Sequence, residues 1–125
     1  MNLQPHILII VIDIEDAKTN EKIKYIEKEF KVFFLDIINI EEIGIYLAKN
    51  KIGIILTIDN NNDLYEPYIK KYGDRYCKIW LQCILEEINN YDEITTIIMN
   101  KYINTIINNN FYENVISVYT TVYNS

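Results

Sequence analysis

A nine-residue run in the middle of the chain, residues 51–59, sets the strongest limit on what the sequence can fold into. Between its charged ends the run is almost wholly apolar and rich in β-branched isoleucine, as is typical of a β-strand. It does not alternate apolar with polar residues, so we expect both faces to be covered, as in the centre of a parallel sheet. Gly53 lacks a side chain, which predicts that a covering helix approaches the strand closely. Asp59 and the asparagines after it predict an abrupt end.

Three more apolar runs of strand length occur, at residues 7–12, 32–37 and 76–85. The first run stops at an acidic cluster, and the second leads into a segment with helical periodicity. The last run carries Lys78 and Gln82, so we expect its strand to have a more mixed face than the others. Together with the central run, these segments predict four strands.

Two helices are expected between the first three strands, where apolar residues recur three or four positions apart. Asp16 is expected to cap the first, over residues 17–30, with its carboxylate also complementing the helix dipole. Asn39 is expected to cap the second, which ends at Asn50.

Two further helices are expected in the second half of the chain. One begins at Asp63, accommodates Pro67 in its first turn and ends just before Gly73. The other is the longest of the chain and is expected over residues 92–108, after a polar loop at 86–90.

The order of these segments predicts the fold class. Strands that alternate with helices at intervals of roughly 20–25 residues indicate βαβ units with right-handed crossovers. We expect an α/β fold: a small three-layer parallel sheet of four or five strands, Rossmann-like or flavodoxin-like, with a long C-terminal helix. Residues 1–90 would form the parallel-sheet domain, and residues 91–125 the helix and tail of the same structural unit. Residues 115–119 fit either a fifth strand or a further helical turn.

Composition narrows the functional classes. A chain of 125 residues fits one domain, and its net charge of −6 argues against binding the phosphate backbone of nucleic acids. An acidic body suits a basic protein partner instead. Cys77 and Cys83 form neither a disulfide framework nor a zinc motif, so we expect buried reduced thiols and a cytoplasmic protein. We expect no signal peptide and no membrane span, so that any membrane association comes through a partner.

Acidic residues follow two of the expected strands, at the edge of the sheet where ligands of parallel sheets bind. They are Asp13, Glu15, Asp16 and Asp59. This layout resembles a phospho-accepting receiver domain, which also needs a hydroxyl residue ending strand four and a lysine ending strand five. Strand four ends near Gln82 and Cys83, and residues 115–122 contain no lysine. We therefore interpret the acids as solvated loop residues and helix caps, and retain a degenerate receiver-like signalling or protein-interaction domain as the alternative function.

The residues give little support to a phosphate-binding loop, a nucleophilic triad or a metal site. A phosphate-binding loop requires glycine where the phosphate approaches the backbone, and the turn after the first strand contains no glycine. The single histidine, His6, precedes the first strand and is expected to be exposed, which leaves no base for a nucleophilic triad. We expect no catalytic residues, no cofactor and no metal site.

The expected long helix is apolar over more than one narrow stripe. Its apolar positions are Ile94, Ile97, Ile98, Ile103, Ile106 and Ile107. Such a helix is buried on two sides or binds a partner. Tyrosines also gather around residues 65–76 and in the C-terminal third, which fits either local packing or an interface.

Several stretches, in matching order, resemble one known family. Residues 11–19 read VIDIEDAKT, similar to a turn of the form V-I-G-D-E-D-T-x-T, although Asp13 replaces the glycine. Residues 51–57 read KIGIILT, similar to a third strand D-I-G-I-I-L-I, and Tyr91-Asp92 precedes the last helix much as H-P-Y-D does. The chain thus resembles the F-subunit family of the rotary V-type ATPase, a non-catalytic component of the central stalk. The family's proline-rich end of strand four and the basic run of its last helix have no counterpart here.

The resemblance implies a function without an active site of its own. It implies a cytoplasmic rotor component, peripheral to a membrane through the complex, that couples ATP hydrolysis to rotation and proton transport. Its terminal helix would lie against the coiled-coil D-subunit of the stalk, near other rotor components, with no nucleic acid bound and no direct membrane insertion. The implied contact residues are Ile94, Ile97, Ile98, Lys101, Tyr102 and Thr105. The core residues behind them would be Ile9, Val11, Ile54 and Leu56.

Overall fold

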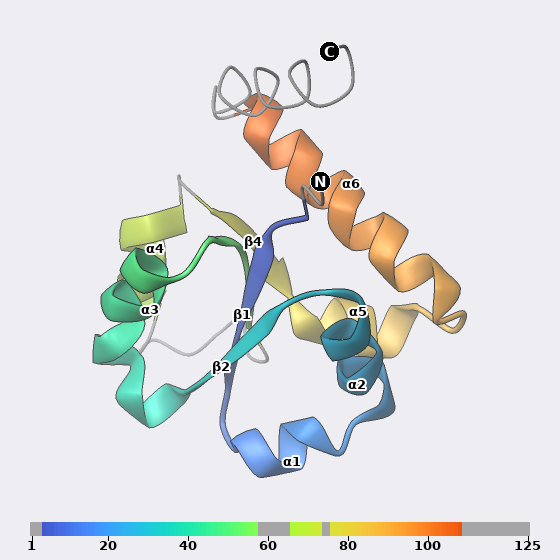
Figure 1. The fold of residues 1–125 in the computed structure, drawn as a ribbon, viewed down its shortest axis with the longest axis horizontal. Coiled ribbons are helices and arrows are strands. Elements are labelled where there is room, and N and C mark those ends of the chain that lie inside the picture. The colour runs from blue at the N-terminus through green and yellow to red at the C-terminus, as the bar shows by residue number, and fades with distance from the viewer. Residues whose placement is uncertain (1–3, 58–65, 74–75, 109–125) are drawn as a thin grey trace.

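The fold is built on a parallel sheet of four strands in the order β2-β1-β3-β4 (Figure 1). A computed structural model describes residues 4–57, 66–73 and 76–108. The strands are β1 (His6–Val11), β2 (Val32–Asp36), β3 (Ile52–Thr57) and β4 (Cys77–Trp80). All three pairings are parallel, which confirms an α/β fold with a four-stranded parallel sheet. The segment expected to form a fifth strand or a helical turn lies outside the described residues.

Both faces of the sheet are covered, as the unbroken apolar runs predict. Ile54 and Leu56 of β3 point into one core cluster together with Ile9 and Val11 of β1, and all four are buried. The second cluster lies on the opposite face and includes Leu8, Ile10, Ile52 and Ile55. Each fully buried isoleucine contributes about 1.5–3 kcal/mol to folding, so the two central strands supply much of the stability.

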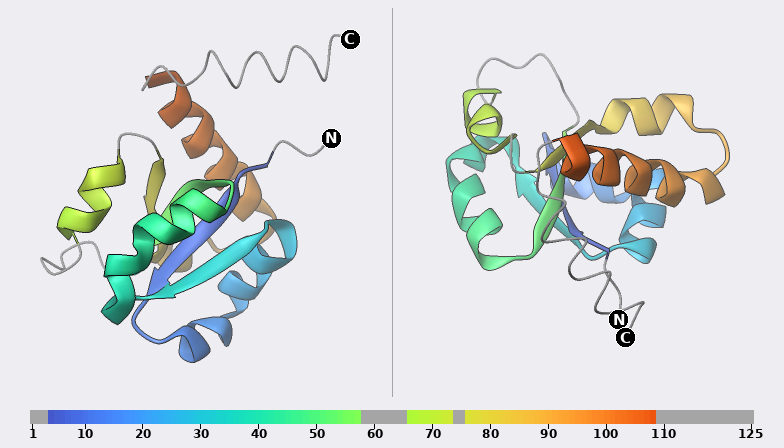
Figure 2. Two further views of the ribbon diagram at one scale, coloured as in Figure 1. Left: turned by 60° about the vertical axis from the view of Figure 1, so that its left-hand side comes forward. Right: turned by 90° about the horizontal axis from the view of Figure 1, so that it is seen from above.

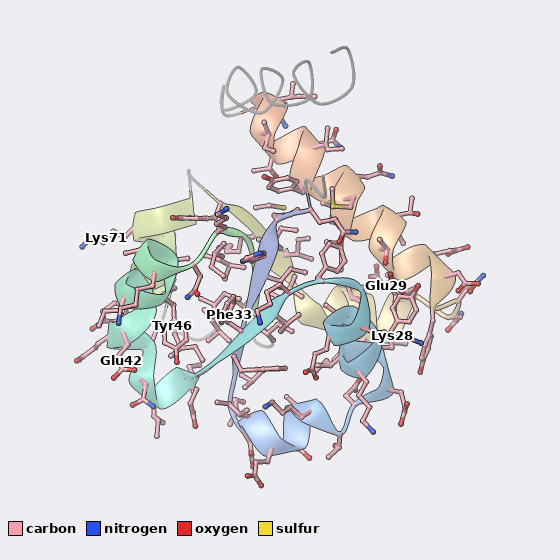
Figure 3. The ribbon with its side chains drawn as sticks, viewed as in Figure 1. Lys28, Glu29, Phe33, Glu42, Tyr46 and Lys71 are labelled. Carbon is pink, nitrogen blue, oxygen red and sulfur yellow. The ribbon has the colours of Figure 1, made fainter. Side chains whose placement is uncertain are left out.

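Helices form a layer on each face of the sheet, which Figure 2 shows from above. On one side lie α1 (Ile14–Lys18), α2 (Glu21–Glu29), α5 (Leu81–Glu87) and α6 (Asp92–Asn108). On the other lie the 3₁₀ helix η1 (Ile37–Glu42), α3 (Ile43–Lys49) and α4 (Glu66–Gly73). Phe33 of β2 and Tyr46 of α3, labelled in Figure 3, pack against the second core cluster.

The first helix differs from the sequence prediction because two side chains cap separate helices. We expected one helix over residues 17–30 with Asp16 as its cap. Instead, Asp13 Oδ1 accepts from the backbone N of Glu15 at 3.0 Å and of Asp16 at 3.3 Å, and so starts α1 early. Asn20 Oδ1 then accepts from the N of Lys22 at 2.9 Å and begins α2. Short polar side chains bond the backbone in this way where a helix starts, and thereby break a longer one.

The segment after β2 also starts earlier than expected. Asp36, rather than Asn39, is the N-cap, and its side chain accepts from the backbone N of Ile38. Asn39 lies inside η1 with non-helical angles of φ −105° and ψ 24°. The predicted end at Asn50 is confirmed: this residue is the C-cap of α3, and its Nδ2 donates to Tyr46 O at 2.9 Å.

The fourth strand is shorter than predicted, and a helix replaces the second half of the expected strand and the first two residues of the expected loop. The apolar run at residues 76–85 contains β4 only as far as Trp80, after which α5 extends to Glu87. Ile84 in α5 and Ile88 directly after it are both buried, so this segment still packs into the core although it is not a strand. The preceding helix contains Pro67 in its first turn, as predicted, and ends at Gly73. Its predicted start, Asp63, lies outside the described residues.

Candidate partner-binding surface

The terminal helix α6 has the predicted bounds of Asp92–Asn108 and carries all six residues expected to bind a partner. Its N-terminus is capped by Asn90, whose Oδ1 accepts from the backbone N of Asp92 at 3.1 Å. Asp92 and Glu93 in the first turn complement the positive end of the helix dipole. The helix packs beside β4 and α2, and its C-terminal end extends beyond the sheet (Figure 1).

One row of α6 side chains faces the sheet and is core. Ile94 and Ile98 lie one turn apart, have no exposed surface and belong to the same cluster as Ile54 and Leu56. These two residues were expected to contact a partner, and in the folded domain they have no surface to offer one. The helix is anchored by this row, and a partner must contact other faces of it.

Tyr102 lies two turns after Ile94 in the same row of α6, and its ring lies so close to β3 that position 53 has no room for a side chain. A Cβ added at Gly53 would lie 2.9 Å from Tyr102 Cε1 and 2.6 Å from Pro5 Cβ, closer than packed carbon atoms approach. The pairing of β3 with β1 also shifts at this point, since His6 pairs with Ile52 and the next residue of β1 pairs with Ile54. The predicted close approach of a helix at Gly53 is therefore confirmed.

The neighbouring row of α6 contains Ile97, Lys101 and Thr105. Ile97 is half-buried at the edge of the core, Lys101 is exposed, and Thr105 Oγ1 donates to Lys101 O at 2.9 Å. Ile97 and Lys101 line a groove of about 260 Å³ between α5 and α6. The residues that line this α5–α6 groove are Ile84, Glu87, Ile88, Glu93, Ile97 and Lys101.

The outer face of α6 carries two exposed isoleucines, Ile103 and Ile107, with 38% and 52% of their surface accessible. Ile103 follows buried Ile94 by nine residues, which at about 100° per residue places it on the opposite side of the helix. The expected contact set omitted both residues, although the sequence shows their four-residue spacing. Their position relative to Ile94 indicates two apolar rows on opposite sides of the helix, but not which of the two faces outward.

The described acids at the carboxyl edge of the sheet lie at the start of α1. Asp13 caps α1, and Glu15 and Asp16 are exposed in its first turn. Within the described ranges, no group of three or more His, Cys, Asp or Glu side chains gathers in a way that would hold a metal ion. Asp59 lies outside those ranges, and β4 ends at Trp80 rather than at a hydroxyl residue.

Two side chains that can act as a nucleophile or a base, those of Cys77 and His6, are wholly or partly buried. Cys77 is a buried free thiol in β4, and burial raises its pKa, opposed by a hydrogen bond with Thr105 and the charge of Lys101. His6 was expected to be exposed, but it is half-buried in β1, with its ring 6.0 Å from that of Phe33. Its Nδ1 is buried without a hydrogen-bond partner among the described residues.

Comparisons with known proteins add no relative to this picture. No family model matches the sequence, and searches of curated proteins and of solved structures found no significant match. Among the described helices, none is both long enough and apolar enough to cross a membrane. Fold and surface together define a small parallel-sheet α/β domain whose terminal helix is apolar on its inner and outer faces.

Proposed function

We propose that the chain is a non-catalytic central-stalk component of a V-type ATPase, of the F-subunit kind. In this role it binds the coiled-coil D-subunit of the stalk through α6 and couples ATP hydrolysis to rotation and proton transport. It would be cytoplasmic and reach the membrane only through the complex. The observation that carries the proposal is the outer apolar row of α6, Ile103 and Ile107.

The shape of this row suits a helical partner. Two isoleucines one turn apart form a short apolar ridge, and ridges of this kind pack into the grooves between side chains of a facing helix. A coiled coil offers such a surface along its length. Ile103 and Ile107 are therefore the proposed primary contacts, and exposed Lys101 lies at the side of the same helix.

The inner row of α6 fits a rotor component for a different reason. A helix that transmits torque must be joined firmly to its own domain, and Ile94, Ile98 and the close Tyr102–Gly53 contact join α6 to the sheet. Ile94 and Ile98 thus serve the proposed function as an anchor rather than as partner contacts.

The positions of the family-like stretches support the same proposal. Residues 11–19 cover the end of β1 and helix α1, and β3 contains the Ile-Gly-Ile-Ile-Leu segment. Tyr91-Asp92 stands at the start of α6. The segment in β3 and the start of α6 thus fit the elements that the resemblance implies, whereas most of the expected turn after β1 is the short helix α1.

Purification of tagged protein from the cells that produce it tests the proposal. We expect a coiled-coil protein and the other ATPase components to be recovered, and their yield to fall when Ile103→Asp is introduced. Ile38→Asp is a matched control, because Ile38 is 80% exposed on η1, far from α6. Recovery of the chain without any coiled-coil protein or ATPase component would refute the proposal.

A further inference from the structure

The α5–α6 groove has a charge pattern that is complementary to itself. Along α6, Glu93, Ile97 and Lys101 follow one another at four-residue spacing, so an acid, an apolar residue and a base share one row. All three line the groove, together with Glu87 from the end of α5. The acidic end of the groove therefore lies near the turn between the helices, and the basic end two turns further along α6.

The charges of this row form no ion pair within the described part of the domain. Glu93 and Lys101 are eight residues apart, or about 12 Å along the helix axis, too far to pair with each other. Among the described residues neither forms a salt bridge. Ile97 between them is only half-buried, so it retains apolar surface at the centre of the row.

We infer that this groove binds a second copy of the chain, with the two α6 helices antiparallel and a two-fold axis near Ile97. In that arrangement Glu93 faces the partner's Lys101 and Lys101 faces the partner's Glu93, while the two Ile97 side chains meet at the centre. A two-fold interface requires this kind of self-complementary surface. Charged residues about 6 Å to either side of the crossing point come within reach at normal helix spacings of 8–10 Å.

Several features favour a second copy over an unrelated protein. The charge order of this row is complementary to itself, which favours a second copy, and this local attraction must outweigh the repulsion between two chains of net charge −6. Glu87 adds a second carboxylate beside Glu93 to attract the partner's Lys101. The apolar floor, Ile84 and Ile88, lies below the crossing point. The groove is lined by six residues of each chain, fewer than the roughly 20–30 a side of a standard interface, so we expect a weak dimer that dissociates on dilution.

This self-association is independent of the proposed rotor function, since it uses the flank of α6 rather than its outer row. Sedimentation equilibrium at chain concentrations up to about 1 mM, in about 0.1 M salt, which screens the overall repulsion more than the close charge pairs, measures it directly. We expect the average mass to rise from 14.9 kDa for one chain toward twice that value, and to fall back in about 1 M salt, which screens exposed charges. A wild-type chain that keeps the mass of one chain at every concentration would overturn the inference.

Charge reversal supplies the decisive test, because it changes exposed residues and leaves the core intact. Glu93→Lys and Lys101→Glu each replace both attractions of the dimer by repulsions, and we expect each to weaken self-association on the order of tenfold or more. Lys49→Glu, with the same charge change as Lys101→Glu but at an exposed site on α3, should dimerise as the wild type does.

A mixture of the two single variants should dimerise, although neither variant does so alone. In the mixed pair the basic row of the Glu93→Lys chain faces the acidic row of the Lys101→Glu chain, which restores both attractions. The double variant, which only exchanges the two charges, should also dimerise as the wild type does. Self-association of both single variants at the wild-type level, or failure of their mixture to associate, would show that the row does not form the interface.

Discussion

At the scale of single residues, Gly53 determines how closely α6 can lie against the sheet. Gly53→Ala adds one carbon that would lie 2.6 Å from Pro5 Cβ and 2.9 Å from the Tyr102 ring. We expect a loss of about 1–3 kcal/mol in the free energy of unfolding, typical of overpacking, measured by urea denaturation. Gly44→Ala within α3 is the control and should be neutral or stabilising, since alanine favours helices over glycine. An unchanged stability for Gly53→Ala would contradict the close contact.

The buried thiol of Cys77 gives a second prediction, on pH dependence. Burial is the largest influence on this group and raises its pKa above the ordinary value of 9.0. As pH rises through that ordinary value, the unfolded chain loses the proton while the folded chain keeps it, so ionisation favours unfolding and stability falls. We expect the free energy of unfolding to decline less steeply between about pH 8 and 10 in Cys77→Ala than in the wild type. Identical slopes would mean that Cys77 titrates alike in both states.

At the scale of elements, the two apolar rows of α6 predict opposite effects of one kind of substitution. Ile98→Asp places a carboxylate in the core, where Ile98 has no exposed surface, and should cost about 3–5 kcal/mol or unfold the domain. Ile103→Asp places the same group on the outer face and should change stability by less than about 1 kcal/mol. Thermal unfolding of the two variants measures the difference. Equal stability losses would show that both rows are core.

Helix α6 also shows which features of the fold the sequence predicts and which it does not. The bounds of α6 and the centres of β1, β2 and β3 are predictable, because long apolar runs are closed by polar or charged residues. Which row of α6 is inner and which is outer is not predictable. Periodicity gives the angle between Ile94 and Ile103, but not which of them meets the sheet. That choice depends on packing against β4, which joins residues distant in sequence.

Short elements are the other limit on prediction. Helix α5 begins directly after β4 within one apolar run, and a run of this length fits a strand or a helix equally well. The break between α1 and α2 depends on whether Asp13 and Asn20 bond the backbone, a competition that propensity alone does not settle. In the α5–α6 groove, Glu87 and Ile84 come from that unpredicted helix, so the sequence alone did not indicate the groove.

At the scale of the whole molecule, the sheet is a platform that holds α6 with two of its faces turned outward. Helices cover both faces of β1 and β3, so the domain depends on no further chain to bury its core strands. Both proposed contacts therefore fall on α6. Ile103 follows Ile97 by six residues, which places the outer row and the groove row about 120° apart around the helix axis.

This angular separation predicts that the two associations can be removed one at a time. Ile103→Asp should lower the recovery of the coiled-coil partner and leave the concentration-dependent self-association unchanged, because the groove row is intact. Glu93→Lys should have the opposite effect, since it reverses a charge in the groove and leaves Ile103 and Ile107 exposed. Purification from cells and sedimentation of the same two variants give the four measurements. If one substitution removed both associations while the domain stayed folded, a single surface would serve both partners and the two-face arrangement would be wrong.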